Sequence, residues 1–330
     1  MPSIHDIAAR LTRPGLGILA ADESIGTMSS RLEAEGITAS QDARRDYRGL
    51  LLNAPGLAES VSGIIVCDET FHESLDGTPF PDVARDNSVL VGVKVDTGIS
   101  RLAGADGATI TEGLDALGAR LADYAAGDAA FAKWRAVIDV TTASDYALET
   151  NAHALARYAA LCQEHGIVPI VEPEVLCGGD HDIDTCAEVT GRALASVFDH
   201  LERQGVDLRG IVLKPNMVTA GLDAPRVAPE EVAARTVAVL LDHVPEDVPG
   251  IAFLSGGHPT EAVCEYLAIM NAGTERLPWA LTYSFGRALV SDALRAWAGK
   301  PENVATAQAI LLQNCQHASA ATSSVIAAGR

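Results

Sequence analysis

Short apolar segments recur along the whole chain and predict eight buried β-strands. They are apolar almost throughout rather than alternating with polar residues, which is the pattern of strands that are covered on both faces. The predicted strands span residues 15–23, 61–69, 90–96, 131–140, 167–174, 210–216, 250–257 and 279–286.

Amphipathic segments between these strands predict helices. The clearest are residues 114–127, 147–166, 187–205 and 229–244. Eight alternating strands and helices favour an α/β fold, a single (β/α)8 barrel over residues 1–330 with an N-terminal helix and a C-terminal helix plus tail from about residue 301. An open doubly wound sheet is the alternative, but no GxGxxG motif follows the first strand. Ser3 and Asp6 have the spacing of a helix capping box.

Polar residues gather where the predicted strands end, which is where barrel enzymes carry their active sites. These strand ends carry Asp22, Ser24, Lys94, Glu172, Glu174, Lys214, Ser255, Gly256, Ser284, Gly286 and Arg287. In the fourth strand, Lys133 and Arg135 are two residues apart and therefore share one face. We interpret Asp68 and Glu69, after the second strand, as structural or helix-capping acids.

The chain is acidic, with 24 Lys and Arg residues against 44 Asp and Glu residues and a formal charge of −20. This charge argues against nucleic acid or an anionic membrane as the main partner. It does not argue against a small anionic substrate, because a site on an acidic protein can be locally basic. No apolar run reaches the roughly 18 residues that a membrane span needs.

The cysteines and histidines are scattered. The 6 Cys form no CxxC pair, and no signal peptide is recognisable, so we expect reduced thiols in the cytoplasm. The 9 His include no HxH or HxxxH pair. We therefore expect no metal and no other cofactor, while a metal site assembled from distant residues stays open.

Lysine is rare in this chain, because only Lys94, Lys133, Lys214 and Lys300 occur and all other basic residues are Arg. Lys300 follows a predicted helix, whereas the other three lie in or at the edge of strand-like runs. Arg can replace Lys wherever only a charge is needed, so a strand-borne Lys suggests an amine that must lose its proton. A Lys that snorkels from a strand end is the alternative.

An amine among carboxylates suggests carbonyl chemistry. A neutral lysine amine attacks a ketone, loses water and leaves an iminium ion, which is an electron sink that allows a nearby carbon–carbon bond to break. With a reference pKa near 10.4, only roughly 0.04% of lysine is neutral at pH 7, so burial and a second cation are expected nearby to lower that pKa. Asp22, Glu172 and Glu174 are available as proton donors and acceptors.

Two regions predict phosphate binding. The glycines of Ser255-Gly256-Gly257 let backbone N–H groups approach an anion, and Gly286-Arg287 adds a helix N-terminus and a guanidinium. Barrel enzymes often bind phosphate with these two loops. A second phosphate subsite is expected from Ser24, Thr27, Arg31, Arg44 and Lys94. Two phosphate sites flanking a lysine suit a sugar bisphosphate.

Seven motifs occur in order between about residues 14 and 300: GILAADES, GVKVDTG, FAKWR, PIVEPEVL, LKPNMV, FLSGG and WALTYSFGRAL. Together they resemble the class I fructose-bisphosphate aldolases. The resemblance implies a barrel enzyme, usually a homotetramer, that works without a metal. It also implies reversible cleavage of fructose 1,6-bisphosphate to dihydroxyacetone phosphate and glyceraldehyde 3-phosphate, in glycolysis and gluconeogenesis.

The resemblance further implies roles for individual residues. Lys214 matches the Schiff-base lysine, Glu172 the general acid/base and Asp22 the carboxylate that handles the C4-hydroxyl proton. Lys133 matches a supporting cation, and Glu174 matches the residue that orients the lysine network. The implied substrate-binding residues are Ser24, Thr27, Arg31, Arg44, Lys94, Arg135, Ser255, Gly256, Ser284, Gly286 and Arg287.

The chain departs from the family pattern in three places. Ser30 stands where many members have Lys, and Phe285 stands where many have Tyr. Many members also end in a Tyr that aids proton exchange at C3 of the enamine, whereas the last Tyr here is Tyr283 and we expect the final residues to form a mobile tail. A metal-dependent aldolase, a sugar-phosphate isomerase and a non-catalytic binding barrel are the alternatives.

Overall fold

A computed structural model describes residues 2–273 and 276–323 of the chain. Eight parallel strands form a closed barrel in chain order, and the last strand returns to pair with the first. The strands are β1 Gly17–Ala21, β2 Val61–Val66, β5 Leu90–Lys94, β8 Phe131–Ile138, β9 Val168–Val175, β10 Val212–Leu213, β11 Gly250–Phe253 and β12 Ala280–Phe285. All eight predicted strands are confirmed, and closure of the sheet rules out the doubly wound alternative.

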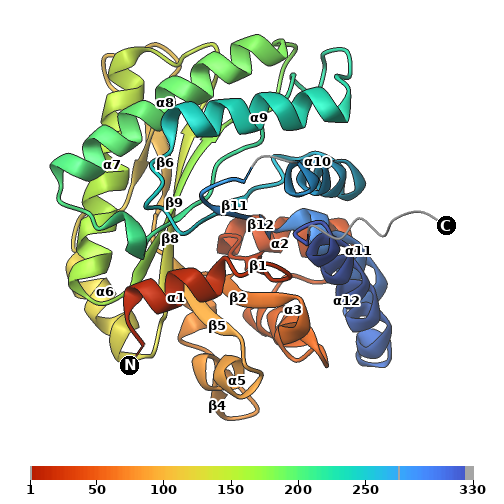
Figure 1. The fold of residues 1–330 in the computed structure, drawn as a ribbon. Helices are drawn as coiled ribbons and strands as arrows, with labels where there is room; N and C mark the ends of the chain where they lie inside the picture. The colour runs from red at the N-terminus through yellow and green to blue at the C-terminus, as the bar shows by residue number, and fades with distance from the viewer. Residues whose placement is uncertain (1, 274–275, 324–330) are drawn as a thin grey trace.

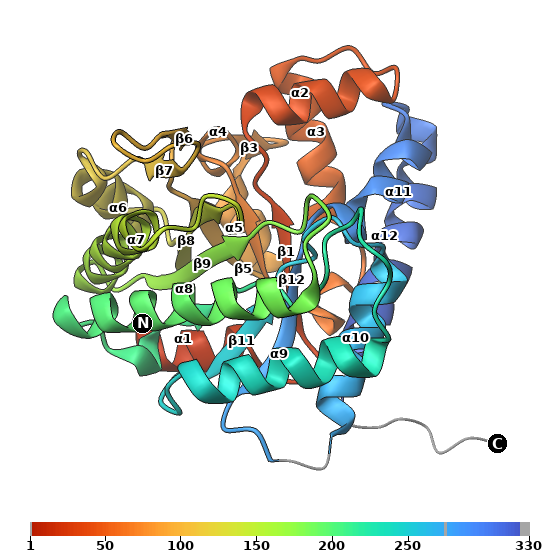
Figure 2. The ribbon, with the colours of Figure 1, turned by 90° about the horizontal axis from the view of Figure 1, so that it is seen from above.

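Helices surround the barrel, as Figures 1 and 2 show. Those before β9 are α1 Ile4–Leu11, α2 Ile25–Ala34, α3 Gln41–Leu52, α4 Asp68–Phe71, α5 Phe80–Asp86, α6 Leu117–Ala126 and α7 Asp145–Glu164. Those after β9 are α8 Ile183–Arg203, α9 Pro229–His243, α10 Thr260–Ala272, α11 Arg287–Trp297 and α12 Val304–Ala320. Short 3-10 helices span Leu57–Glu59, Leu208–Gly210 and Pro301–Asn303.

Two antiparallel hairpins lie outside the barrel, and the sequence did not predict them. One pairs β3 Ser74–Leu75 with β4 Thr78–Pro79, and the other pairs β6 Gly98–Arg101 with β7 Thr109–Glu112. Their strands are short and partly exposed, so they lack the continuous apolar runs that marked the barrel strands.

The predicted helices agree closely with α6, α7, α8 and α9. The main differences are that α8 begins at Ile183 rather than at residue 187, and that α6 begins later than predicted. Ala116 has a φ of 55°, in the left-handed region, so the helix begins only at Leu117 rather than at residue 114. The capping box before α1 is confirmed. Ser3 Oγ accepts a hydrogen bond from the Asp6 N–H at 3.2 Å, and Asp6 Oδ2 accepts one from the Ser3 N–H at 3.1 Å.

The sixth barrel strand is shorter than predicted, because β10 contains only 2 residues. Leu213 pairs with Val171 on β9 and with Ile251 on β11. Pro215 follows soon afterwards and has no N–H to extend the ladder. Lys214 therefore stands where the chain leaves the sheet, at the carboxyl end of the strand.

An apolar cluster fills the other end of the barrel interior. Residues Ile7, Ala8 and Leu11 of α1 pack against it, so this helix closes the barrel on that side. A Cβ on Gly63 would lie 2.9 Å from side-chain atoms of both Leu11 and Phe131, so glycine lets the helix and the aromatic ring approach β2. The polar side chains of the barrel interior therefore lie at the opposite end, toward the carboxyl ends of the strands.

The C-terminal helix α12 packs on the outside of the barrel. Tyr283 of β12 is buried, and its hydroxyl donates to Ser60 O at 2.6 Å and to Cys315 O of α12 at 3.4 Å. The predicted C-terminal helix is thus confirmed, whereas residues 324–330 of the predicted tail lie outside the described residues. Within the described part of the chain, every helix is too short or too polar to cross a membrane.

Candidate active site

Four charged side chains reach one end of the barrel interior because of the strand period. Successive strand residues point to opposite faces, so the residue two positions beyond an interior residue is interior as well. The interior apolar cluster includes Ala20, Phe131, Ile170 and Val212. Two positions further along the chain lie Asp22, Lys133, Glu172 and Lys214. Four of the five predicted catalytic residues therefore meet: Asp22 and Lys214 just beyond the ends of β1 and β10, and Lys133 and Glu172 within the longer strands β8 and β9.

These four side chains form a chain of alternating charge. Lys214 Nζ lies 3.2 Å from Glu172 Oε1, and Lys133 Nζ lies 3.3 Å from Glu172 Oε2 and 2.6 Å from Asp22 Oδ2. No side chain of the four is more than 13% exposed. Glu172 thus contacts both lysines, and Lys133 contacts both carboxylates.

The buried charges set one another's protonation. Burial by itself would raise the pKa of Asp22, but Lys133 and Lys214 outweigh it and lower that pKa to about 2. Burial is also outweighed at Glu172, where the same two lysines lower the pKa. At Lys133, burial opposes the charge, yet Asp22 and Glu172 raise the pKa above its usual value. At neutral pH, both carboxylates are ionised and Lys133 is a cation.

Glu174 makes a different contact from Glu172, although both lie on the same face of β9. Its carboxylate accepts a hydrogen bond from Arg135 Nε. Burial lowers the pKa of Arg135, but the charge of Glu174 overcomes this and raises it. Nearby, Lys94 Nζ lies 2.6 Å from Asp96 Oδ1. In the described residues, Glu174 therefore contacts Arg135 rather than either catalytic lysine.

The predicted phosphate loop follows β11, beginning at Ser255. Gly256 and Gly257 have φ values of 58° and 95°, a left-handed conformation that favours glycine. A Cβ on Gly257 would lie 3.7 Å from Arg287 Nη2, so this guanidinium lies against the loop. Gly286 precedes Arg287, the first residue of α11. The loop, the helix N-terminus and the cation therefore converge as the sequence predicted.

Three of the predicted binding residues, Ser24, Thr27 and Ser284, carry hydroxyl groups. Ser284 is the last but one residue of β12, and its buried Oγ has no hydrogen-bond partner among the described residues. Ser24 is the N-cap of α2, where its Oγ accepts from the Thr27 N–H at 3.2 Å and lies 3.0 Å from Thr27 Oγ1. Ser24 and Thr27 are both exposed, so their hydroxyls are accessible from solvent.

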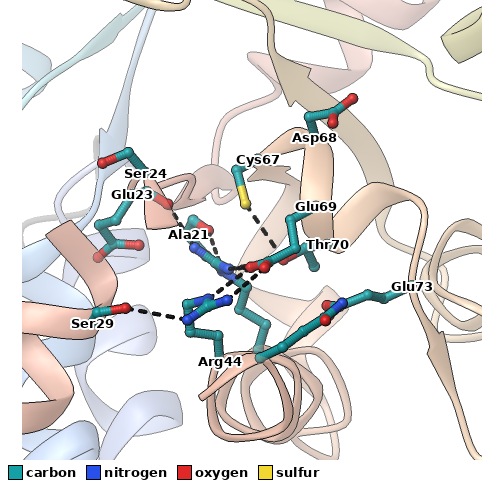
Figure 3. Close-up of polar contacts among 12 residues, drawn as sticks. Ala21, Glu23, Ser24, Ser29, Arg44, Cys67, Asp68, Glu69, Thr70 and Glu73 are labelled. Carbon is teal, nitrogen blue, oxygen red and sulfur yellow. Dashed lines mark hydrogen bonds and ion pairs between the residues drawn. The ribbon is translucent and has the colours of Figure 1, made fainter. Parts of the chain in front are cut away.

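The cations of the predicted second phosphate subsite are each paired with an acid. Arg31 donates to Glu23. Arg44 is only 8% exposed, donates to both carboxylate oxygens of Glu69 at 2.6 and 2.8 Å, and donates to Ser29 Oγ at 3.2 Å (Figure 3). With Lys94 bound to Asp96, these side chains do not form an open cluster of free cations. Glu69 has the structural role that the sequence analysis assigned to it.

Comparison with known proteins gives the family. The model described as fructose-bisphosphate aldolase class I matches residues 3–329. The chain belongs to this family. The protein named fructose-bisphosphate aldolase 5, cytosolic, from Arabidopsis thaliana is 49% identical over 318 residues, which cover 96% of this chain and 89% of that protein. Fructose-bisphosphate aldolase B from Gallus gallus is 45% identical over 319 residues, with 95% and 88% covered.

A solved aldolase structure has the same fold. The fructose-bisphosphate aldolase from Plasmodium falciparum, in a ternary co-crystal structure with TRAP and a small molecule inhibitor, matches with a TM-score of 0.95 and 40% identity. The match covers 99% of this chain and 95% of that one. This aldolase is accordingly a lyase with fructose-bisphosphate aldolase activity in glycolysis and gluconeogenesis. Membership of class I implies Schiff-base chemistry and metal independence.

The acidic side chains of the site are paired with lysines. Across residues 2–273 and 276–323, no group of three or more His, Cys, Asp or Glu side chains is arranged to hold a metal ion. The carboxylates of this aldolase's site are instead occupied by the ammonium groups of Lys133 and Lys214.

Two buried residues near the site were missed by the sequence analysis. Asn216 Oδ1 accepts from the Val175 N–H at 3.0 Å, and its Nδ2 donates to Thr190 Oγ1 at 3.1 Å, so it ties the end of β10 to β9. It lies beyond β10 and its partner Thr190 belongs to α8, so the strand period of the sequence could not have placed it. Arg48 belongs to a run of arginines on α3 that resembles a solvated helix face, so nothing in the sequence distinguished it.

Proposed function

We propose that this aldolase cleaves fructose 1,6-bisphosphate through a Schiff base on Lys214. The observation that carries the proposal is the buried chain from Lys214 through Glu172 and Lys133 to Asp22. The neutral amine of Lys214 attacks the C2 ketone to form a carbinolamine, which loses water and leaves an iminium ion. Glu172 Oε1, 3.2 Å from Lys214 Nζ, takes the proton that the amine loses and delivers it to the departing hydroxyl.

Carbon–carbon cleavage requires a base at the C4 hydroxyl, and Asp22 fills that role. Asp22 takes the hydroxyl proton, the C3–C4 bond breaks, and its electron pair flows into the iminium to give an enamine. The C4 fragment leaves as glyceraldehyde 3-phosphate. A pKa of about 2 keeps Asp22 in the carboxylate form that accepts this proton. Lys133 holds Asp22 in place, and its charge stabilises negative charge that develops on substrate oxygens.

The enamine then gains a proton at C3, and water releases dihydroxyacetone phosphate from Lys214. Glu172 or an ordered water supplies that proton. Glu174 supports these steps indirectly, because it fixes Arg135 beside the lysine chain.

The two phosphate groups bind at opposite sides of this lysine chain. We assign one phosphate to the loop and helix N-terminus formed by Ser255, Gly256, Ser284, Gly286 and Arg287. We assign the other phosphate and the sugar hydroxyls to Ser24, Thr27, Arg31, Lys94 and Arg135. Arg31, Lys94 and Arg135 also have acid partners but are partly exposed, whereas Arg44 is only 8% exposed and donates to both carboxylate oxygens of Glu69. We therefore assign Arg44 no direct contact with substrate.

Borohydride trapping tests the covalent step. Reduction in the presence of dihydroxyacetone phosphate should attach a three-carbon phosphate adduct to Lys214, which peptide mapping would locate. Lys214→Arg should abolish both trapping and turnover, because a guanidinium stays protonated. An adduct on Lys94 or Lys133 would contradict the assignment.

We also propose a single catalytic domain over residues 1–330, with residues from about 301 as its C-terminal extension, that assembles as a cytoplasmic homotetramer. Arabidopsis relatives at 49% and 48% identity carry the name cytosolic. With a net charge of −20, sugar phosphates rather than nucleic acids or membranes are the expected partners. Light scattering should give four times the 34.4 kDa of one chain.

A further inference from the structure

Arg48 of α3 has a fully buried guanidinium, with 0% of the residue exposed. A buried charge is costly unless its donors find acceptors and an opposite charge lies near. The opposite charge is Glu69, whose Oε2 lies 3.9 Å from Arg48 Nη1 and is also bound by Arg44. Arg48 has no contact with Lys214, Glu172 or Lys133 among the described hydrogen bonds and ion pairs.

The three nitrogens of Arg48 bind acceptors around the carboxyl end of β1. Its Nε donates to Ala21 O at 3.0 Å, and its Nη2 donates to Glu23 O at 2.7 Å. Its Nη1 donates to the hydroxyl of Thr70, in α4, at 2.9 Å. In Figure 3, Ala21, Glu23 and Thr70 lie in the same group of polar contacts as Arg44 and Glu69. The two backbone acceptors are the residues on either side of Asp22.

This arrangement matters because β1 ends at Ala21, one residue before the catalytic carboxylate. Asp22 therefore lies beyond the last residue of the strand, where strand pairing no longer holds the chain. A planar guanidinium that binds both carbonyls fixes the Ala21–Asp22 peptide directly before Asp22 and the Glu23–Ser24 peptide one residue beyond it. The direction of the Asp22 side chain toward Lys133 Nζ, 2.6 Å away, follows from that backbone conformation.

We propose that Arg48 is a positioning residue for Asp22, holding the backbone on both sides of it so that its carboxylate meets the C4 hydroxyl of the substrate. The proposal rests on the proposed role of Asp22 in cleavage. Through Thr70, the same side chain also connects the end of β1 to α4, the short helix that follows β2, so the position of Asp22 depends on two neighbouring segments rather than one.

The first test replaces the planar fork and keeps the charge. Arg48→Lys should lower kcat for cleavage by about 10- to 100-fold, because small misplacements of a catalytic group cost that much. KM and borohydride trapping of dihydroxyacetone phosphate should stay within about twofold of the parent enzyme, because Lys214 and Glu172 are untouched. Arg45→Lys is the matched control, since Arg45 lies on the same helix and pairs with Asp42 and Asp46 at the surface. It should keep the parent kcat.

A double-mutant cycle separates positioning from general loss of structure. Single-turnover cleavage is measured for Arg48→Lys, for Asp22→Asn and for the two combined. If Arg48 acts through Asp22, Arg48→Lys should cause no further loss of residual cleavage in the Asp22→Asn background. An equal loss in both backgrounds would overturn the proposal for Arg48. Normal cleavage by Asp22→Asn alone would instead overturn the proposed role of Asp22.

Thr70→Val provides a second, milder variant in case Arg48→Lys does not fold. Thr70 is buried, and valine keeps its shape while removing the acceptor for Arg48 Nη1. It should lower kcat by roughly two- to tenfold, a smaller effect in the same direction, and leave dihydroxyacetone phosphate trapping unchanged. A folded Thr70→Val enzyme with the parent kcat would contradict the proposal.

Discussion

At the scale of single residues, Glu172 is the group on which the proton transfers depend. Its Oε1 lies 3.2 Å from Lys214 and its Oε2 lies 3.3 Å from Lys133. The Oε2 atom is buried and, within the part of the chain that the structure describes, has no partner with hydrogen-bond geometry. A carboxylate oxygen accepts more than one hydrogen bond, so Glu172 keeps capacity for a substrate oxygen or a water while it contacts both lysines.

Glu172→Gln should therefore slow turnover by on the order of 10²–10⁴-fold, the usual loss when a general acid/base is removed. The amide keeps the size of the side chain but cannot carry the proton, so formation of the Schiff base should become the slow step. Rapid borohydride quenching would measure that rate, with Glu164→Gln, an exposed change at the end of α7, as the control. An unchanged rate of Schiff-base formation would assign the proton transfer to another group.

The same scale shows what the sequence can and cannot predict about a site. Lys214, Lys133 and Glu172 were found because strand-borne charges at strand ends are rare and the strand period sets their direction. The role of Arg48 and the pairing of Arg44 with Glu69 were not predicted. Both depend on how α3 packs against the end of β1 and against α4. A helical arginine looks alike in sequence whether it is solvated or buried.

At the scale of elements, the barrel strands explain most of the site. Four strands, β1, β8, β9 and β10, carry an apolar residue at the closed end and a charged residue two positions later. The stagger between neighbouring strands, which sets Lys133 opposite Ile170, brings these charges together. The eight strands were predictable from their continuous apolar runs. The short span of β10 and the two hairpins were not, because strand length depends on pairing with neighbours and the hairpins lack an apolar signal.

The loop after β11 and the start of α11 give an element-scale prediction. Arg287→Ala should raise the dissociation constant of dihydroxyacetone phosphate roughly 10- to 100-fold, since a hydrogen bond to a charged group contributes about 1.5–3 kcal/mol. The backbone donors at Ser255 and Gly256 should preserve some affinity. Arg295→Ala, on the last turn of the same helix and paired with Asp292, is the control.

Calorimetric titration of dihydroxyacetone phosphate at low ionic strength would measure the effect, because salt screens an exposed cation. Arg287→Lys should recover part of the lost affinity by restoring the charge without the planar fork. Affinity in Arg287→Ala equal to that of the parent enzyme would place the phosphate elsewhere.

At the scale of the whole molecule, two kinds of charge act on stability in opposite directions. The surface carries a net charge of −20 at pH 7, which destabilises the compact state through self-repulsion. The buried and paired acids act the other way. Asp22, held by Lys133 and Lys214 against the opposing effect of burial, and Asp207, held mainly by Arg209, both have a pKa of about 2, below the ordinary 3.8.

The pH dependence of unfolding should reveal both effects. A carboxyl whose pKa is lower in the folded state binds more protons when unfolded, so its stabilisation is present above about pH 3.8 and is lost as the pH falls toward 2. Between pH 8 and about 5.5, protonation only reduces the net negative charge, toward the pI near 4.7. The melting temperature should accordingly rise by a few degrees from pH 8 to 5.5 and fall steeply below pH 4. Lys133, whose raised pKa makes it protonated throughout, contributes no slope in this range.

Scanning calorimetry at fixed protein concentration would measure the profile in dilute buffer and in roughly 0.5 M salt, where the screening length is only a few ångströms. Salt should flatten the rise between pH 8 and 5.5 and leave the part of the fall below pH 4 that Asp22 contributes. The buried pair of Asp22 with Lys133 is screened far less than the exposed pair of Asp207 with Arg209. A melting temperature that drops steadily from pH 8 to 5.5 at both salt concentrations would show that self-repulsion is not what limits the stability of this barrel.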